Sequence, residues 1–482
     1  MEETIYWHDY ETFGADPKTD RPAQFAGIRT DFELNIIGEP LVVYCKPADD
    51  MLPAPEACLV TGITPQEAAE KGVVEAEFIK GILAEFQKPK TCVAGYNSIR
   101  FDDEVTRFTL YRNLHDPYAR EWRNGNSRWD IIDMVRLCHA VRPEGINWPQ
   151  HEDGKPSFRL EDLSAANGIS HEDAHDALSD VIATIELAKL IKKSQPKLYE
   201  FIYNLRKKNE VAKQLNLFEK RTVLHVSSRY SAETGCIAPV IPVAADKTNK
   251  NLIYVYDLRR DPQELLDLDA EQIKQRIFTS AADLEAKGLE RIPLKGVYLN
   301  RCPVVVPKGV MNNEQAAGYA IDFDKCEEYR LKLISVMGLD EKITKIFSGD
   351  DFEEPTDPDQ MLYSGGFFSS EDRRKMDMIV SLAPAELKEL EMTFDDSRLQ
   401  EMLFRYKARN YPLILSENEK ERWNSFRIKR LTQNGFGSSI IYPEFLEKID
   451  AAVASPEISA EKKSVLLSLK EYGQELLQEK NQ

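Results

Sequence analysis

The chain has 482 residues, 42% of them hydrophobic and 30% charged, so it is too long for a single small module and too apolar for a disordered chain. Its 63 basic and 81 acidic residues give a formal net charge of -18, which argues against broad nonspecific adhesion to nucleic acid or anionic lipid. The sequence shows neither a basic, apolar leader nor an apolar run of the roughly 18 residues that a membrane span needs. Because the seven cysteines are scattered without a Cys-x-x-Cys pair, we expect no disulfide framework and no zinc site, and we expect a cytoplasmic protein that does not bind membranes.

The first 195 residues alternate predicted strands with predicted helices. Apolar runs bounded by Gly and Pro predict strands at 4–9, 23–29, 39–45 and 91–95. Thr64, Pro65 and Glu67 combine an N-cap, a proline at the first helical position and a capping-box glutamate, which predicts the start of a helix. Residues 173–193 carry a long helical pattern that ends before a proline. This alternation is typical of an α/β domain, which we place at 1–195.

After residue 195 the pattern changes to short strands separated by turns. The expected strands lie at 223–228, 236–243, 252–258 and 296–306. They indicate a small barrel with helical insertions over 196–348. The segment 349–360 contains six acids and two prolines in twelve residues, so we interpret it as an extended linker. Residues 361–482 show helical spacing and a second capping box at Ser416 and Glu419, which predicts a C-terminal α-helical domain.

Two carboxylates lie at the end of the first predicted strand. Side chains alternate between the two faces of a strand, so Asp9 and Glu11 point to the same side. Neighbouring acids with no basic residue beside them repel each other unless a divalent cation lies between them, and oxygen ligands suit Mg²⁺ or Mn²⁺. The Asp-x-Glu pattern is also common in so acidic a chain, and taken alone it is more often a solvated pair than a metal site.

Two further clusters carry titratable groups. Asp102 and Asp103 follow the predicted strand at 91–95, where they either line a cleft or complement the dipole of the next helix. His175 and Asp180 are five residues apart and would point about 140° away from each other on a continuous helix. They share a site only if His175 lies in the loop or frayed turn before the helix; otherwise His175 is a surface residue.

The order of these clusters along the chain is more specific than any one of them. Asp-x-Glu, then Asn-x-x-x-Phe-Asp, then His-x-x-x-x-Asp resembles the DEDD exonucleases of the histidine-bearing subclass, which have a ribonuclease-H-like fold and remove nucleotides from 3′ ends. Further blocks are similar to bacterial exonuclease I over nearly the whole chain, among them HDYETFG at 8–14, TGITPQEA at 61–68, RPEGINWP at 142–149 and YKARNYP at 406–412. That resemblance implies an SH3-like barrel and a C-terminal helical domain after the exonuclease domain.

The resemblance also assigns roles to individual residues. It implies that Asp9, Glu11, Asp102 and Asp180 hold two Mg²⁺ ions, with Mn²⁺ as a substitute, and that His175 activates water. The family pattern favours Asp102 as the third acid because it directly follows a phenylalanine, but Asp103 could also reach the metal.

Arginine and tryptophan gather in one window of the sequence. Residues 96–142 contain eight Arg and no Lys, and Trp122, Trp129 and Trp148 lie within 27 residues. Flat rings beside guanidinium groups make a stacking surface for unpaired bases, although Trp129 and Trp148 could equally be core residues. From this window and the resemblance we expect the substrate to contact Glu11, Arg107, Tyr118, Trp122, Arg136, Arg142, Phe158 and Arg159.

Together these features predict a Mg²⁺-dependent 3′→5′ exodeoxyribonuclease that degrades single-stranded DNA processively to 5′-mononucleotides in DNA repair and recombination. The alternatives are a 3′→5′ exoribonuclease on short RNA and a non-catalytic scaffold that binds single-stranded nucleic acid. The set of four acids and one histidine argues against the scaffold, and the long chain beyond the catalytic domain argues against the short-RNA enzyme. The resemblance further implies a monomer that binds the acidic, apolar-ended C-terminal tail of the single-strand-binding protein through Arg142, which could instead be a solvated arginine.

Overall fold

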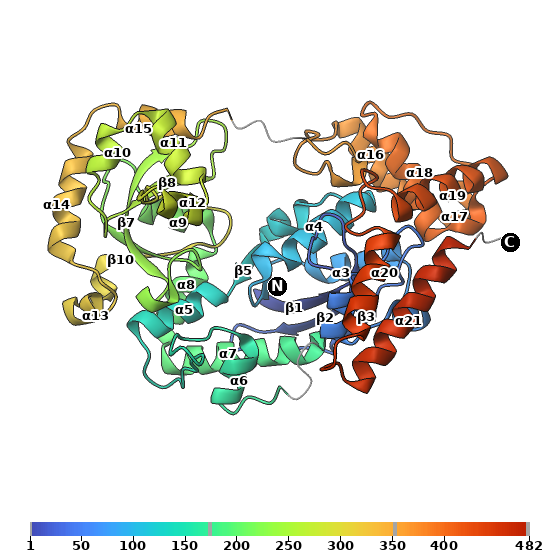
Figure 1. Ribbon diagram of the computed structural model, residues 1–482, viewed down its shortest axis with the longest axis horizontal. Coiled ribbons are helices and arrows are strands. Elements are labelled where there is room, and N and C mark those ends of the chain that lie inside the picture. The colour runs from blue at the N-terminus through green and yellow to red at the C-terminus, as the bar shows by residue number, and fades with distance from the viewer. Residues whose placement is uncertain (1, 172–175, 350–353, 479–482) are drawn as a thin grey trace. The chain divides into compact units, whose positions relative to one another are not determined.

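The computed structural model describes residues 2–171, 176–349 and 354–478. Contacts between residues group the chain into two compact units. The first unit consists of Met1–Ser127, His171–Ile185 and Glu353–Gln482, and the second consists of Arg128–Ser170 and Glu186–Phe352. Figure 1 shows that the first unit combines blue residues from the beginning of the chain with orange and red residues from its end. Among the helices of the described ranges, none is both long and apolar enough to cross a membrane.

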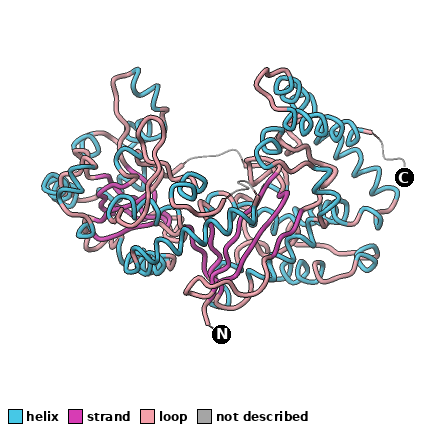
Figure 2. Tube along the Cα trace, turned by 90° about the horizontal axis from the view of Figure 1, so that it is seen from below, coloured by secondary structure: helices cyan, strands magenta, loops and turns pink. Residues whose placement is uncertain are grey.

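A mixed five-stranded sheet in the order β3-β2-β1-β4-β5 confirms the predicted α/β region. Its strands, drawn in magenta in Figure 2, are β1 (Thr4–Thr12), β2 (Pro22–Thr30), β3 (Leu41–Tyr44), β4 (Thr91–Gly95) and β5 (Ser127–Asp130). Strand β1 runs antiparallel to β2 and parallel to β4. The sequence predicted that β1 ends at Asp9, but the strand continues to Thr12 because Glu11 still pairs with Gln24 of β2. The sheet itself therefore fixes the position of Glu11.

Helices of the first unit cover this sheet. They are α1 (Pro55–Thr61), α2 (Pro65–Lys71), α3 (Glu75–Phe86), α4 (Asp102–Arg112) and the beginning of α7 (Ala177–Ser194). Helix α2 starts where predicted, and the Thr64 side chain accepts a hydrogen bond from the Glu67 amide. Helix α3 buries Phe78, Ile82 and Phe86 in a core that also contains residues of β1 and β2.

The predicted C-terminal helices also belong to the first unit. They are α16 (Ser370–Ile379), α17 (Pro384–Lys388), α18 (Arg398–Asn410), α19 (Glu417–Thr432), α20 (Tyr442–Val453) and α21 (Ala460–Leu477). Leu399 and Met402 of α18 share a core with Phe108 of α4. Phe445 of α20 shares another core with Phe13, which follows β1. Because these cores are shared, the C-terminal helices and the exonuclease sheet support each other's folding.

The segment 349–360, predicted to be an extended linker, is anchored at its end. Residues Pro358–Gln360 form a 3₁₀ turn, and Asp359 is buried. Its carboxylate pairs with Arg405 at 3.0 Å and with Arg409 at 2.7 Å, both on α18. The prediction of an extended segment is therefore wrong at this end, because the acids meet buried arginines rather than water. Residues 350–353 lie outside the described residues.

The second unit contains an antiparallel sheet in the order β10-β6-β7-β8-β9. Its strands are β6 (Val223–Val226), β7 (Ile237–Ala245), β8 (Leu252–Asp257), β9 (Leu294–Tyr298) and β10 (Val304–Pro307). The single strand predicted at 296–306 is in fact β9 and β10, because the chain turns between them and Cys302 has a φ of 47°. The two strands lie at opposite edges of the sheet, as in a partly closed SH3-like barrel.

The second unit also contains helices. Two of them, α5 (Ile132–Val141) and α6 (Leu160–Ala166), precede the range 196–348 in which helical insertions were predicted. The helices within that range are α8 (Pro196–Leu205), α9 (Lys208–Gln214), α10 (Gln263–Asp267), α11 (Ala270–Phe278), α12 (Ala281–Ala286), α13 (Asn313–Gly318), α14 (Phe323–Ile334) and α15 (Leu339–Ile346). Several of them start with side-chain caps, and α11 and α13 start with complete capping boxes.

Candidate metal centre and nucleic-acid surface

Three carboxylates from two elements of the first unit converge at one point. Asp9 and Glu11 project from the same side of β1, as the alternation of strand side chains requires, and Asp180 lies in the first turn of α7. One ligand oxygen from each of the three lies within 4.8 Å of the other two. Hard oxygen donors at this spacing form a candidate site for a divalent cation.

The two consecutive acids Asp102 and Asp103 have different environments. The Oδ1 atom of Asp102 accepts a hydrogen bond of 3.1 Å from the amide of Tyr10, which lies between Asp9 and Glu11 on β1. Asp103 instead accepts a hydrogen bond of 2.6 Å from Nη2 of Arg120, and both of these side chains are buried. The geometry therefore holds Asp102 against the strand that carries the other acids, and it gives Asp103 a cationic partner of its own.

The acids of this cluster influence one another's protonation. Burial raises the pKa of Asp9 well above its ordinary value, and the carboxylates of Asp102, Glu11 and Asp180 raise it further. Burial likewise raises the pKa of Glu11, with Asp180 and Asp102 adding to the rise. Several acids this close together and this poorly hydrated hold protons unless a cation offsets their charges. Their electrostatics and their oxygen donors thus fit a site for Mg²⁺ or Mn²⁺.

The predicted general base, His175, lies outside the described residues. The neighbouring His171 is described, and its Nε2 contacts Oδ1 of Asp180. Sequence reasoning did not single out His171. The signal that could have found it is its place after Gly168 in the loop before α7, since a histidine there can bend back to an acid on the first turn of the helix.

Three of the predicted substrate residues lie close together in the first unit. The guanidinium of Arg107 makes two hydrogen bonds with Glu121, at 2.8 and 3.1 Å, and a third with Glu104 at 2.7 Å. The guanidinium also lies over the ring of Tyr118, 5.5 Å from its centroid. The side chain of Trp122 is 64% exposed. Trp122 is thus the most accessible of the three to a base, whereas Arg107 is already paired with carboxylates.

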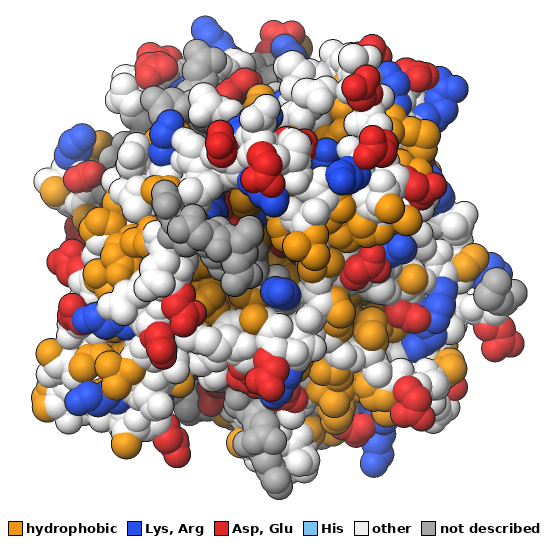
Figure 3. Space-filling model, turned by 90° about the vertical axis from the view of Figure 1, so that its right-hand side faces the viewer, with side chains coloured by type: hydrophobic (Ala, Val, Ile, Leu, Met, Phe, Trp, Pro, Cys, Tyr) orange, Lys and Arg blue, Asp and Glu red, His pale blue; other side chains and the backbone are white. Residues whose placement is uncertain are grey.

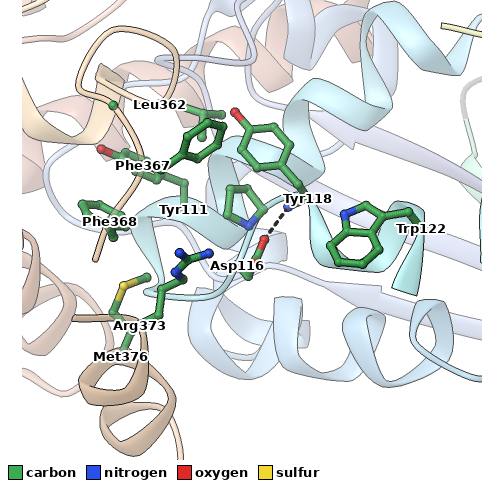
Figure 4. Close-up of a pocket in the computed structure, with 11 residues that line it drawn as sticks. Tyr111, Asp116, Tyr118, Trp122, Leu362, Phe367, Phe368, Arg373 and Met376 are labelled. Atoms are coloured by element: carbon green, nitrogen blue, oxygen red, sulfur yellow. Dashed lines mark hydrogen bonds between the residues drawn. The ribbon is translucent and has the colours of Figure 1, made fainter. Parts of the chain in front are cut away.

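Tyr118 and Trp122 line an aromatic cavity of about 300 Å³. Figure 4 shows Phe367 and Phe368, from the segment before α16, on the opposite side of this cavity. Tyr118 meets Phe367 edge-on, with 6.1 Å between the ring centroids. The amide of Tyr118 donates a hydrogen bond of 2.9 Å to Asp116, which holds the turn that presents the ring. An open cavity lined by aromatic rings offers flat surfaces on which unpaired bases can stack.

Apart from Glu11 of the acid cluster, the other predicted substrate residues lie in the second unit. Arg136 of α5 pairs with Asp133 at 2.6 Å, and its guanidinium lies 5.8 Å from the ring centroid of Phe158. Arg159, the next residue, is exposed at the start of α6. Arg142, just after α5, is also exposed and donates a hydrogen bond of 2.9 Å to the carbonyl of Val310.

The structure buries Trp129 almost completely and Trp148 in part. Trp129 is 1% exposed, and its ring meets Tyr199 and Tyr203 of α8 edge-on, with centroid distances of 5.3 and 5.1 Å. Trp148 is half-buried and donates a hydrogen bond of 2.9 Å to the carbonyl of Pro143. Trp129 is therefore a core residue, which was one of the two alternatives that the sequence left open.

On the face drawn in Figure 3, the described Lys and Arg side chains lie among Asp and Glu side chains, with hydrophobic side chains between them. Some charged side chains form ion pairs with a residue one turn away on the same helix. The nitrogen–oxygen distance is 2.5 Å between Arg374 and Glu371 and 2.9 Å between Lys420 and Glu417. Exposed pairs of this kind contribute little to stability, but they neutralise charge locally.

Sequence models of three families match the chain in succession. The family described as "Exonuclease" matches residues 6–188, the "Exonuclease I SH3-like domain" matches 206–349 and the "Exonuclease I C-terminal domain" matches 356–476. The exodeoxyribonuclease I of Haemophilus influenzae is 44% identical over 475 residues, which cover 98% of this chain and 99% of that protein. The exodeoxyribonuclease I of Escherichia coli is 43% identical over 482 residues and covers 99% of both chains.

Solved structures show the same architecture. A moderately thermophilic exonuclease I from Methylocaldum szegediense is 52% identical and superposes with a TM-score of 0.95, covering 99% of this chain and all (100%) of that one. The zinc-bound complex of Escherichia coli exonuclease I with single-stranded DNA is 42% identical, with a TM-score of 0.93 and coverage of 99% and 100%. A complex of single-strand-binding protein and exonuclease I with an inhibitor is 41% identical, with a TM-score of 0.89 and the same coverage. This full-length similarity shows that the chain belongs to the exonuclease I family of the DEDD exonucleases.

Proposed function

We propose that this protein, a hydrolytic exonuclease that acts on single-stranded DNA, removes 5′-mononucleotides successively from the 3′ end with two Mg²⁺ ions. The observation that carries the proposal is the convergence of Asp9, Glu11 and Asp180 within 4.8 Å. Bound Mg²⁺ would lower the pKa of a coordinated water and stabilise the attacking and leaving oxygens of an in-line displacement. Mn²⁺ has similar ligand preferences and should substitute for it.

Asp102 is the proposed fourth acid, in preference to Asp103. Its hydrogen bond from Tyr10 holds it beside the strand of Asp9 and Glu11, whereas Asp103 is engaged by Arg120. His175 is proposed to accept a proton from the attacking water, since an unperturbed histidine titrates near neutral pH.

The aromatic cavity is the proposed site at which the first unit binds bases. Tyr118 and Trp122 would stack with unpaired bases, and Phe367 supplies a further ring that is 86% exposed. Stacking of this kind tolerates any base, which suits an enzyme that degrades DNA regardless of sequence. Arg107 would contribute by holding the ring of Tyr118 in place through its cation–π contact. Its positive charge is paired with the carboxylate of Glu121.

The second unit would hold the strand through Phe158 and Arg159. The exposed guanidinium of Arg159 is proposed to contact a phosphate, and the adjacent Phe158 is proposed to wedge against a base. Arg136 lies over the ring of Phe158 and would restrict its orientation.

A separate cavity in the second unit is the proposed site for the C-terminal tail of the single-strand-binding protein. It has a volume of about 390 Å³ and is lined by apolar side chains that include Leu137, Val141 and Phe201, with Arg142 and Lys197 also in its lining. A peptide that is acidic and ends in an apolar residue would place that residue in the cavity and its carboxylates beside the two basic groups.

A cytoplasmic location and a monomeric state are also proposed. All seven cysteines are buried and free of disulfides, which suits a reducing compartment. Light scattering of the purified chain would test the monomer. A role in DNA repair and recombination follows from the substrate, and a gene deletion that leaves survival after DNA damage unchanged would argue against it.

A nuclease assay on matched single-stranded DNA, duplex DNA and RNA tests the proposed function. We expect a 3′-labelled DNA strand to lose its label first, in Mg²⁺ or Mn²⁺ but not in EDTA, with little cleavage of duplex DNA or RNA. Excess unlabelled DNA added after the start should leave long strands fully degraded if the enzyme is processive. Preference for short RNA would favour the exoribonuclease, and tight DNA binding without cleavage would favour a scaffold.

A further inference from the structure

Two ion pairs join a short turn to the helix that carries Asp102. The turn is the 3₁₀ segment Ala119–Glu121, and the helix is α4. Arg120 of the turn donates to Asp103 of the helix at 2.6 Å, and Glu121 of the turn accepts from Arg107 of the helix at 2.8 Å. Asp103 and Arg107 are one helical turn apart and therefore lie on the same face of α4. In one pair the turn supplies the cation, and in the other it supplies the anion. A shift of the turn along the helix would therefore place like charges together, so only this alignment is favourable.

The pair between Arg120 and Asp103 is the more deeply buried of the two. Their side chains are 0% and 3% exposed, against 7% and 11% for Arg107 and Glu121. The guanidinium of Arg120 lies 4.9 Å from the ring centroid of Phe86, on the apolar side of α3. A buried ion pair of this kind resists displacement, because moving either partner leaves an uncompensated charge out of water.

This pair is next to the proposed metal centre in the sequence. Asp103 follows Asp102, and Asp102 is held on its other side by the amide of Tyr10. The first turn of α4 is thus fixed from two sides, by β1 through Asp102 and by the 3₁₀ turn through Asp103. The same turn is flanked by Tyr118 and Trp122, which line the aromatic cavity.

We propose that Arg120 is a positioning residue for the exonuclease reaction, which fixes Asp103 and thereby directs the Asp102 carboxylate toward the metal ions. The inference rests on the proposed function, because it takes Asp102 as a metal ligand. Because its side chain is 0% exposed, Arg120 is proposed to contact neither metal nor substrate. It acts by limiting the orientations of the first turn of α4, so that the ligand is in place before the cation arrives.

The sign of the effect of Arg120 on cation binding distinguishes positioning from simple electrostatics. Replacing Arg120 by an uncharged residue removes a positive charge near the acid cluster, and electrostatics alone would then make a cation bind more tightly. Loss of positioning would make the cation bind more weakly. The two explanations therefore predict opposite changes for the same substitution.

The test uses the full-length chain with Arg120→Met, Arg120→Lys and Asp103→Asn. The matched control is Arg112→Met, which breaks another buried pair of α4, with Glu75 at 2.6 and 2.8 Å, at the far end of the helix. Calorimetry measures the binding of Mn²⁺ alone in the absence of DNA, thermal unfolding reports stability, and hydrolysis gives the Mg²⁺ concentration for half-maximal rate.

We expect Arg120→Met and Asp103→Asn to weaken Mn²⁺ binding about 10-fold, the lower end of the effect of losing an outer partner of a metal ligand. Arg120→Lys, which keeps the charge but not the planar fork, should recover part of that loss. Arg112→Met should lower the unfolding temperature and leave Mn²⁺ affinity within about 2-fold. If Arg120→Met does not fold, Arg120→Lys carries the test, because it keeps the positive charge and weaker Mn²⁺ binding then reflects lost positioning. Asp103→Asn only supports it, since loss of a negative charge near the acids by itself weakens cation binding.

Mn²⁺ affinity that is unchanged or higher in folded variants of Arg120 and Asp103 would overturn the inference. An equal loss in Arg112→Met would also overturn it, because the effect would then be one of general stability. Failure of the wild-type chain to bind Mn²⁺ at all would instead refute the proposed metal centre, so the two failures are distinguishable.

Discussion

The amide of Tyr10 donates a hydrogen bond of 3.1 Å to Oδ1 of Asp102, a residue 92 positions further along the chain. Tyr10 lies between Asp9 and Glu11 on β1, and its own side chain faces away from theirs because side chains alternate along a strand. Its hydroxyl lies 3.0 Å from that of Thr106, whose Oγ1 donates to the Asp102 carbonyl at 2.8 Å. The strand that supplies Asp9 and Glu11 thus also holds the helix that carries Asp102.

Replacing His175 should slow the chemical step. His175→Ala is expected to lower kcat by about 10²–10⁴ with little change in KM, as for loss of a general base. Steady-state hydrolysis of 3′-labelled single-stranded DNA measures both constants. His171→Ala is the matched control, since it removes the histidine four positions earlier in the sequence, and its kcat should stay within about 10-fold of wild type. A normal rate for His175→Ala would show that another group accepts the proton.

Phosphate binding by Arg159 should appear in the salt dependence of DNA affinity. Each phosphate contact releases counterions, so Arg159→Ala should reduce the slope of log K against log salt by about one. Binding titrations of labelled single-stranded DNA in EDTA, at several salt concentrations, give the slope without cleavage. Lys448→Ala is the control, because its side chain is 49% exposed and lies on α20, no residue of which lines either proposed cavity. Equal slopes for Arg159→Ala and wild type would place Arg159 away from the DNA.

Lowering the pH should destabilise the first unit by protonating the carboxylate of Glu75. Burial alone would raise the pKa of Glu75, but the guanidinium groups of Arg112 and Arg21 lower it to about 2, below its ordinary 4.5. Because the folded-state pKa is the lower one, the ionised carboxylate stabilises the fold above about pH 4.5, and this contribution is lost as the pH falls toward 2.

Glu75→Gln should therefore lose stability at pH 7, by about 3–5 kcal/mol, because it leaves a buried arginine without its partner. The loss should shrink as the pH falls from 4.5 toward 2. Thermal unfolding over this range measures it, with the exposed Glu444→Gln as control. A difference between Glu75→Gln and wild type that stays constant with pH would show that Glu75 keeps its ordinary pKa.

Binding of the single-strand-binding protein should depend on Arg142 while cleavage of bare DNA does not. Arg142→Ala is expected to weaken binding of an acidic, apolar-ended tail peptide about 10-fold, since hydrogen bonds to charged groups are worth about 1.5–3 kcal/mol. Fluorescence anisotropy of a labelled peptide measures the affinity. Arg221→Ala, whose side chain is 76% exposed in the same unit, should bind the peptide normally. Unchanged affinity in Arg142→Ala would reject the proposed site.

The sequence predicted those features that depend on neighbours along the chain. Alternation along a strand is enough to bring Asp9 and Glu11 to one side, and local capping is enough to start α2 at Pro65. It did not predict which of two consecutive acids has a cationic partner, because Arg120 reaches Asp103 only after the turn has folded onto α4.

Other features also depended on tertiary contacts. Trp129 is a core residue because α8, more than sixty positions later, covers it, and Asp359 is anchored because α18 supplies two arginines. The strand predicted at 296–306 is divided because β10 pairs with β6 at the opposite edge of the sheet. The order of the motifs was informative about function in spite of these errors, because it depends only on which residues follow one another along the chain.

Hydrolysis by an Asp180→Ala variant tests the metal centre most directly. Asp180 supplies one of the three converging ligands, and it is not among the proposed DNA contacts. In Mg²⁺ the variant should show no measurable release of nucleotides from single-stranded DNA, while its affinity for the same DNA in EDTA stays within a few-fold of wild type. Glu444→Ala, which removes an exposed acid from the first turn of α20, should cleave normally. Turnover in Mg²⁺ by the folded Asp180→Ala protein would contradict the assignment of this acid cluster as the catalytic metal site.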